Sequence, residues 1–321
     1  MNKTKVLWIE SLRGIACLIV LVAHIISIHH TNGMFANGCG KIAVWFFFVI
    51  SAFFSLCKFD INQLNWNGIK RYYGNRAIKL YPTYIVGLLF AYSTGFISDI
   101  KSIFEHIFLI SGQGHFWYMA VIIKFFLLVP LIRYIYVKTN NDKVFLGLLL
   151  VIGSLFAMIF PWNTYVENSI SLRWYIPVFC MGLALSVIFK ENNQTRNNFV
   201  GDVFAILSIF IIGSMTPYVR WKIWGVPASS FLQNKYLFVG ALWCVIFVGI
   251  LHGKYIKKFL NNATFLHIIG KYSYEIYIFH YLLLILFRNL QVPWELNALL
   301  TISGSIVISV VLKGIFSCVK R

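Results

Sequence analysis

Residues 12–29 read LRGIACLIVLVAHIISIH, an apolar run interrupted by few polar side chains, chief among them Arg13 and His24. An α-helix of this length rises roughly 27 Å at about 1.5 Å per residue. The hydrocarbon core of a bilayer is about 30 Å thick. The run therefore predicts a membrane-spanning helix.

The rest of the chain repeats this pattern. Further apolar runs of similar length lie near residues 41–57, 78–97, 115–136, 144–161, 174–190, 200–217, 236–252, 268–287 and 297–317. Residues 99–111 (DIKSIFEHIFLIS) are amphipathic and too short to cross, which predicts an interfacial helix. We expect an all-α polytopic membrane protein of about ten transmembrane helices, folded as one domain over residues 1–321.

The composition supports this class and excludes others. Of the 321 residues, 59% are hydrophobic and 12% charged, whereas a soluble domain carries about 25% charged residues. The mean hydropathy is +0.76. These values exclude a soluble domain, a disordered chain and a coiled coil, and the length of the runs favours helices over a β-barrel.

The net charge of +18 is explained by orientation in the membrane. With the N-terminus in the cytoplasm, the inner segments hold 18 Lys and Arg and the outer segments hold 7. This split follows the positive-inside rule and predicts that both termini are cytoplasmic. No soluble basic domain is visible, so we expect no nucleic-acid partner. The six cysteines form no CxxC pair or Cys/His spacing, so we expect neither a metal site nor a permanently bound cofactor.

Polar groups inside the spans are the first candidates for function, because burying an unpaired charge is costly. Arg13 and His24 are 11 residues apart, only about 20° past three full helical turns. They share a helix face about 16 Å apart, with His24 near the bilayer centre. The alternative is that neither residue has a catalytic role: Arg13 would then anchor the helix at the lipid headgroups, and His24 would only pack in the core.

Other spans carry polar groups to similar depths. Ser51 lies ten residues below Lys41, a depth of about 15 Å that it can share with His24, and His280 also lies near the midplane. Together they suggest a polar cavity or tunnel. Further candidates for its lining come from the fourth span, namely His115, Trp117 and the more deeply placed Lys124. Glu275 and Lys271 are four residues apart and are expected to pair.

A basic segment, IKRYYGNRAIKLYPTY (69–84), precedes the third span. We expect a cytoplasmic loop here, with Pro82 in the first turn of the following helix, where its missing N–H costs least. Arg71, Arg76 and Lys79 could hold the phosphates of a cofactor. The alternative is that these cations only set the membrane topology.

Five segments in order resemble the acyltransferase-3 family of integral membrane acyltransferases. They are Arg13-x10-His24 with Gly14, FFFVISAFF (46–54), NRAIKLYP (75–82), HFWYMAVIIKFFLLVP (115–130) and GKYSYEIYIFH (270–280). The resemblance covers nearly the whole chain. It implies transfer of an acyl group, usually acetyl, from cytoplasmic acyl-CoA to a hydroxyl of a cell-surface glycan.

The resemblance also implies roles for individual residues. It makes Arg13 and His24 the essential pair, with His24 as a base or as an acyl relay. It assigns the cytoplasmic CoA-binding motif to Arg76 and Lys79, with Arg71 compensating for a missing family arginine and Arg13 contributing. Ser51 and Trp117 match family motifs with no assigned step.

Some positions depart from the family pattern. Asn75 and Lys79 stand where the family's basic motif has arginines, so a bidentate phosphate contact is lost there. Ala52 replaces a glycine of the second-span motif, and Ile122 and Ile123 stand where one subgroup has glutamates. The chain therefore resembles the glutamate-free subgroup.

The expected activity is that of a multi-pass O-acetyltransferase (EC 2.3.1.-) of the bacterial inner membrane. Acetyl-CoA would be its co-substrate, and a lipid-linked or nascent surface glycan such as O-antigen, capsule or exopolysaccharide its acceptor. A glycan exporter or flippase of the same architecture is the alternative, with polar groups lining a pathway. Against export, the sequence shows no internal repeat and no carboxylate at mid-depth.

Overall fold

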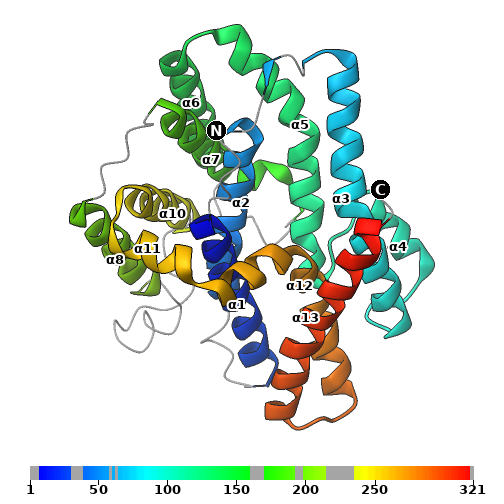
Figure 1. Ribbon diagram of the computed structural model, residues 1–321. Coiled ribbons are helices and arrows are strands. Elements are labelled where there is room, and N and C mark those ends of the chain that lie inside the picture. The colour runs from blue at the N-terminus through cyan, green and yellow to red at the C-terminus, as the bar shows by residue number, and fades with distance from the viewer. Residues whose placement is uncertain are drawn as a thin grey trace.

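The computed structural model describes residues 7–29, 39–57, 60–61, 64–159, 170–191, 198–214 and 235–318. These residues form a bundle of helices, with one isolated bridge between Asn198 and Gly253 and no strand (Figure 1). The helices are α1 (Leu7–His29), α2 (Cys39–Cys57), α3 (Trp66–Ser93), α4 (Ile100–Ile107), α5 (Trp117–Thr139), α6 (Asp142–Ile159), α7 (Ile176–Glu191), α8 (Phe199–Ser214), α10 (Lys235–His252), α11 (Tyr255–Asn262), α12 (Thr264–Asn289) and α13 (Trp294–Cys318). Short 3-10 turns, η2 (Gly114–Phe116) and η4 (Leu172–Tyr175), precede α5 and α7.

The helices agree with an all-α membrane protein. Within the described residues, six helices are long and apolar enough to cross a bilayer: α1, α2, α5 with η2, α6, α7 with η4, and α13. The apolar stretches of α8 and α10 are shorter. The chain is thus a multi-pass membrane protein, and the number of ten spans stays a prediction.

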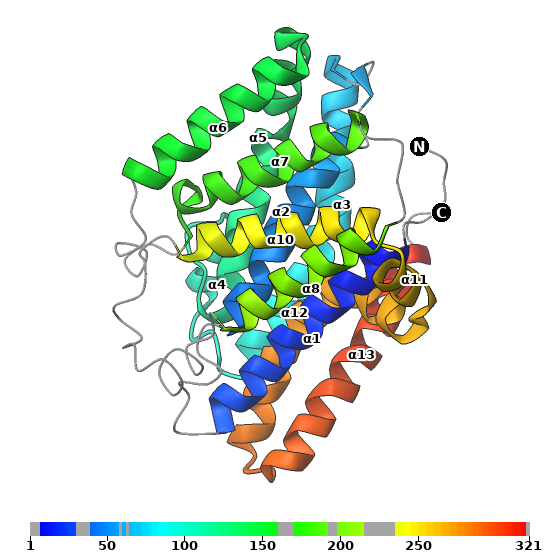
Figure 2. The ribbon, with the colours of Figure 1, turned by 90° about the vertical axis from the view of Figure 1, so that its left-hand side faces the viewer.

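The two ends of the chain are related in space. The first turn of α1 and the last turns of α13 lie at the same end of the bundle (Figure 2). An even number of spans would give this arrangement. Residues 1–6 and 319–321 lie outside the described residues, so the cytoplasmic position of the termini stays a prediction.

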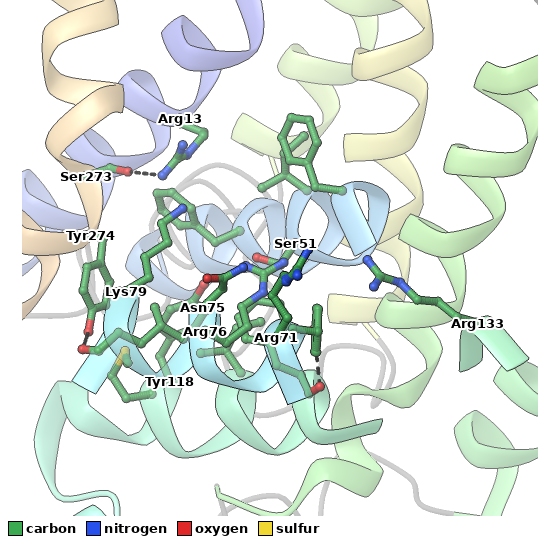
Figure 3. Close-up of a pocket in the computed structure, with 18 of the residues that line it drawn as sticks. Arg13, Ser51, Arg71, Asn75, Arg76, Lys79, Tyr118, Arg133, Ser273 and Tyr274 are labelled. Carbon is green, nitrogen blue, oxygen red and sulfur yellow. Dashed lines mark hydrogen bonds between the residues drawn. The ribbon is translucent and has the colours of Figure 1, made fainter. Parts of the chain in front are cut away.

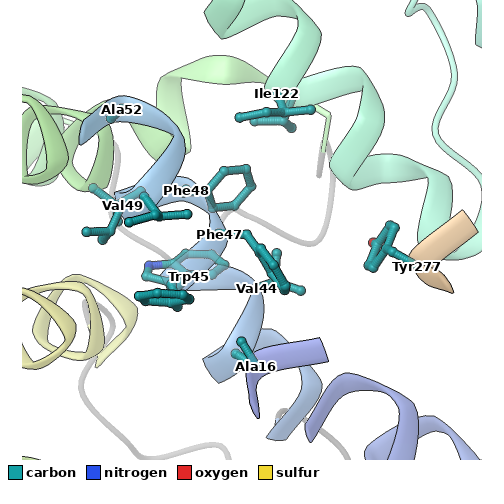
Figure 4. Packing of buried hydrophobic residues seen from close by; sticks show 14 of the residues in the cluster. Ala16, Val44, Trp45, Phe47, Phe48, Val49, Ala52, Ile122 and Tyr277 are labelled. Carbon is teal, nitrogen blue, oxygen red and sulfur yellow. The ribbon is translucent and has the colours of Figure 1, made fainter. Parts of the chain in front are cut away.

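Helix α2 lies at the centre of the packing (Figure 4). Its residues from Ile42 to Phe53 are buried except for Ser51, which is half-buried. A helix that is apolar all round is stable only when neighbours surround it. Aromatic rings supply much of that packing, and Phe48 contacts both Tyr175 and Phe179, with ring centroids 4.9 and 5.2 Å away.

Helices α1 and α12 cross at two glycines. A Cβ on Gly14 would overlap the carbonyl oxygen of Leu266, and a Cβ on Gly270 would overlap that of Glu10. Small residues at a helix crossing let the two backbones approach closely inside a membrane. The crossing places Arg13 of α1 beside Ser273 of α12.

The basic segment before the third span is helical, so the expected loop there is wrong. Helix α3 begins at Trp66, where the side chain of Asn65 caps it by accepting the Gly68 N–H at 2.8 Å. Pro82 therefore lies inside the helix and not in its first turn. The apolar run marks only the part of the helix suited to lipid, whereas the helix continues through polar residues. Pro82 removes one backbone hydrogen bond from α3 but does not end the helix.

The short helix expected between the third and fourth spans is present as α4. The Asp99 carboxylate caps it by accepting the Ser102 N–H at 2.7 Å. His106 donates from Nδ1 to the Ser102 carbonyl at 2.7 Å and accepts the Gln113 N–H at Nε2. Burial lowers the pKa of His106, which keeps this ring neutral and consistent with both bonds.

Candidate functional site

A cavity of about 690 Å³ lies among α1, α2, α3, α5 and α12 (Figure 3). Its size falls within the range of about 300–1,000 Å³ that is typical of organic-ligand pockets. Charged and polar groups from α1, α2, α3, α5 and α12 line it together with apolar and aromatic groups from α2, α3, α5 and α12. The cavity therefore suits a ligand that carries both charged and apolar parts.

Helix α3 supplies most of the charge. Arg71, Asn75 and Lys79 are spaced by four residues and line the cavity together with Tyr72 and Arg76. This spacing places them on one face of the helix, which a loop would not guarantee. The predicted binding residues Arg71, Arg76 and Lys79 are thus brought together.

Arg13 reaches the same cavity from α1. Its guanidinium donates to the Glu10 carboxylate at 3.2 Å and to the Ser273 hydroxyl at 3.0 Å. These two bonds leave other guanidinium N–H groups available to a ligand. Arg13 is therefore held in place by its neighbours on the cavity wall.

Arg133 of α5 is a cavity residue that the sequence analysis missed. It is 7% exposed, and its Nε donates to the Ser55 carbonyl at 2.9 Å. Its guanidinium lies 4.8 Å from the centre of the Tyr72 ring, and that of Arg76 lies 4.2 Å from the Phe126 ring. The available signal was a single arginine inside the apolar run FFLLVPLIRYIYV (125–137), which we counted only as a topology cation.

The cavity is strongly positive. Among its lining residues are five cations and one carboxylate, Glu10. The cations are Arg13, Arg71, Arg76, Lys79 and Arg133. Charge-assisted hydrogen bonds from arginine and lysine are the usual means of holding phosphate groups. The charge of the lining therefore suits an anion that carries several negative charges.

Two tyrosines of the cavity lining lie close together, and one of them contacts a group of histidines. Tyr118 and Tyr277 both line it, with ring centroids 5.1 Å apart. Tyr277 also lies 5.7 Å from the His280 ring, and its hydroxyl donates to the His115 carbonyl at 2.6 Å. Tyr277 therefore lies between the cavity and the two histidines that it contacts.

Together with His24, those histidines form a second group, which we term the histidine cluster: His24, His115 and His280. His24 Nδ1 lies 2.8 Å from His280 Nε2, and the two rings are nearly parallel. His115 Nε2 donates to the Ile278 carbonyl at 2.8 Å, and its ring lies 5.8 Å from that of His280. The sequence analysis placed His24 and His280 at one depth, and the structure joins them directly.

Ser51 lies at a different level, so the expected shared depth with His24 is wrong. A Cβ on Gly40, in the first turn of α2, would lie 3.9 Å from His24 Nε2. Ser51 is 11 residues further along α2, about 16 Å away, and lines the cationic cavity. Counting depth from the ends of runs fails because the helices are offset along the membrane normal.

Three other residues lie away from the expected positions. Lys124 Nζ donates to the Ile170 carbonyl at 3.0 Å, and the Trp117 ring stacks on Tyr175, so neither lines the cavity. Glu275 pairs with Lys313 at 3.9 Å and not with Lys271 as expected. Lys313 belongs to α13, which sequence spacing within α12 does not reveal.

Comparison with known proteins finds similar bacterial proteins. The chain is 24% identical over 299 residues to a protein of Staphylococcus aureus strain MRSA252 named "Probable poly-beta-1,6-N-acetyl-D-glucosamine export protein". The match covers 85% of this chain and 81% of the relative. Its counterpart in strain MSSA476 is 23% identical over the same length and coverage. No solved structure matches the chain significantly.

The family model described as an acyltransferase domain matches residues 6–318. That range includes every helix of the cavity and of the histidine cluster. It also includes the five motifs that carry the resemblance in the sequence. The chain belongs to the acyltransferase-3 family of membrane proteins.

Proposed function

We propose that the protein is an O-acetyltransferase of the bacterial cytoplasmic membrane. It moves an acetyl group from cytoplasmic acetyl-CoA to a hydroxyl of a surface polysaccharide. The observation that carries the proposal is the cavity whose lining holds five cations and one carboxylate. Membership of the family supports acyl transfer, and the names of the relatives support a polysaccharide as acceptor.

The cavity matches the chemistry of the donor. The nucleotide of CoA carries a 3′-phosphate and a pyrophosphate, which Arg71, Arg76 and Lys79 on α3 would hold together with Arg133. The uncharged pantetheine arm and its thioester would extend toward Tyr118 and Tyr277. Arg13 lies on the wall between α1 and α12 and adds positive charge there.

The reaction needs a base for the acceptor hydroxyl. His24 takes the hydroxyl proton as the oxygen attacks the thioester carbonyl carbon. The resulting oxyanion collapses, the C–S bond breaks, and the CoA thiolate leaves with the proton from the imidazolium. The products are an acetyl ester and CoA. This step requires a neutral imidazole close to the hydroxyl. His24 is the candidate, because it is hydrogen-bonded to His280, whose ring contacts Tyr277 of the cavity lining.

Export of the glycan is the second candidate, because the relatives carry that description in their names. In that case the polar groups would line a pathway through the membrane. A CoA-dependent transferase requires a site for several phosphate groups, and the five cations of the cavity could supply it. The cavity therefore favours acyl transfer over export.

An assay in detergent separates the two, because no transport can occur without a membrane. Purified protein would be incubated with acetyl-CoA and a β-1,6-linked N-acetylglucosamine oligomer, and free CoA thiol measured with a chromogenic disulfide. We expect CoA release that depends on the acceptor and matches the ester formed. No release above a His24→Ala preparation would contradict the transferase and favour export.

A further inference from the structure

The hydrogen bonds of the histidine cluster determine which nitrogen of each ring carries its hydrogen. His280 is 1% exposed, and its Nδ1 lies 3.0 Å from the Ile276 carbonyl. A carbonyl oxygen only accepts hydrogen bonds, so His280 Nδ1 is the donor. In the neutral ring, His280 Nε2 is then an acceptor.

The same reasoning extends to His24. Its Nδ1 lies 2.8 Å from His280 Nε2, so Nδ1 must donate the hydrogen of that bond. The lone pair of the neutral His24 ring therefore lies on Nε2. None of the described residues hydrogen-bonds this nitrogen, and His24 is half-buried.

The position of His24 Nε2 indicates where the substrate lies. This nitrogen faces the first turn of α2, since a Cβ on Gly40 would be 3.9 Å away. The Tyr281 ring of α12 makes an edge contact with the His24 ring, with ring centroids 5.0 Å apart. The cationic cavity lies on the other side of Tyr277. The free nitrogen therefore lies beside the first turn of α2, and Tyr277 lies between the cavity and the His280 end of the cluster.

We propose that His280 is a positioning residue that holds His24 with a bare Nε2 facing the first turn of α2, and that the acceptor hydroxyl binds there. This rests on the proposed function and extends it to the acceptor side. The hydroxyl proton passes to His24 Nε2, while His24 Nδ1 keeps its hydrogen bond to His280. The thioester of the donor then reaches this hydroxyl from the cationic cavity by passing Tyr277, and the acceptor approaches His24 from the side of α2.

A second buried lone pair lies in the same cluster. His115 donates from Nε2 to the Ile278 carbonyl, so its Nδ1 is an acceptor, and this buried nitrogen has no partner within the described part of the chain. A buried acceptor without a donor costs free energy unless a water or ligand hydroxyl supplies one. A water molecule, or a ligand hydroxyl that reached the cluster, would supply this donor.

The tautomer of His24 can be measured without any assay of activity. The protein would be labelled with ¹⁵N-histidine and studied by solid-state NMR in lipid bilayers, with the His24 signals assigned by their loss in His24→Asn. We expect wild-type His24 to be neutral with its hydrogen on Nδ1, and His280→Leu to lose that preference. A hydrogen on Nε2 in the wild type would overturn the proposal. This result is independent of whether acetyl transfer occurs.

Kinetics with matched variants test the positioning role. His280→Leu removes the acceptor for His24 Nδ1, and we expect kcat to fall by about 10- to 100-fold with KM for acetyl-CoA unchanged. His280→Gln places an amide oxygen near the former Nε2 and should recover most of the loss. His267→Gln, on the same helix but bonded to the Leu260 carbonyl, is the control and should match wild type. Equal losses in the leucine and glutamine variants would contradict the positioning role.

Gly40→Ala tests the acceptor side separately. The added methyl would lie 3.6 Å from the Ala23 Cβ and 3.9 Å from His24 Nε2, which are ordinary contacts, so the fold should tolerate it. We expect KM for the glycan acceptor to rise several-fold while KM for acetyl-CoA stays constant. Unchanged acceptor kinetics would place the acceptor elsewhere and overturn that part of the proposal.

Discussion

Gly14 on α1 and Gly270 on α12 meet so closely that neither position has room for a side chain. The contact sets the distance between α1 and α12, which contribute residues both to the cavity and to the histidine cluster. Arg13 and Ser273 lie on the cavity side of this crossing, and His24 and His280 lie further along the same pair. The crossing therefore sets the register of both sites.

Enlarging the crossing should destabilise the protein. Gly270→Ala introduces a Cβ that overlaps the Glu10 carbonyl oxygen, and overpacking of this kind costs about 1–3 kcal/mol. We expect a lower midpoint of thermal unfolding in detergent. Gly147→Ala on α6 is the control, because a Cβ there meets nothing within 4 Å. A Gly270→Ala protein as stable as the control would show that the helices can separate at no cost.

Much of the fold could be predicted from the sequence, since apolar runs report directly which segments suit lipid. The candidate cations on α3 were also predictable, because arginine and lysine clusters stand out in an apolar chain. The helical state of residues 66–77 could not be predicted from hydropathy, which is uninformative for the polar part of a helix.

Relationships between distant elements were the least predictable. The pairing of Glu275 with Lys313 joins α12 to α13, and no local spacing encodes it. Arg133 was visible in the sequence, yet its place in the cavity depends on how α5 lies against α3. The level of Ser51 depends on the offset between α1 and α2, which their separate sequences do not report.

Removing the base should abolish turnover. We expect His24→Ala to reduce glycan acetylation by about 100- to 10,000-fold, the usual contribution of general-base catalysis. Complementation of a strain lacking the gene, with acetyl esters measured on the polysaccharide, provides the test. His252→Ala, at the end of α10, controls for loss of a histidine. Normal acetylation by a well-expressed His24→Ala protein would exclude His24 from the mechanism.

Arg133 should contribute to donor binding, although the sequence alone did not identify it as a binding residue. Arg133→Gln removes one cation from the cavity, and we expect the Kd for acetyl-CoA to rise about tenfold, as for loss of one charge-assisted bond. Lys138→Gln on the same helix does not alter the cavity lining and is the matched control. Identical Kd values for the two variants would show that Arg133 does not contribute to donor binding.

The membrane orientation can be tested by labelling. In a protein with its native cysteines replaced, a cysteine at Gln291, in the turn between α12 and α13, should react with an impermeant maleimide added outside intact cells. A cysteine added after Arg321 should react only after the membrane is opened. External labelling of the C-terminal cysteine would contradict the cytoplasmic position of that end.

The central claim is that the cationic face of α3 binds the nucleotide of acetyl-CoA. Isothermal titration of acetyl-CoA into purified wild-type, Arg76→Ala and Lys70→Ala proteins tests it most directly. Arg76 lines the cavity, whereas Lys70 lies on the same helix outside the lining. Loss of one charge-assisted phosphate bond, about 1.5–3 kcal/mol, should weaken binding by about 10- to 150-fold in Arg76→Ala. We expect Lys70→Ala to bind as wild type does, and equal affinities for all three proteins would contradict the account.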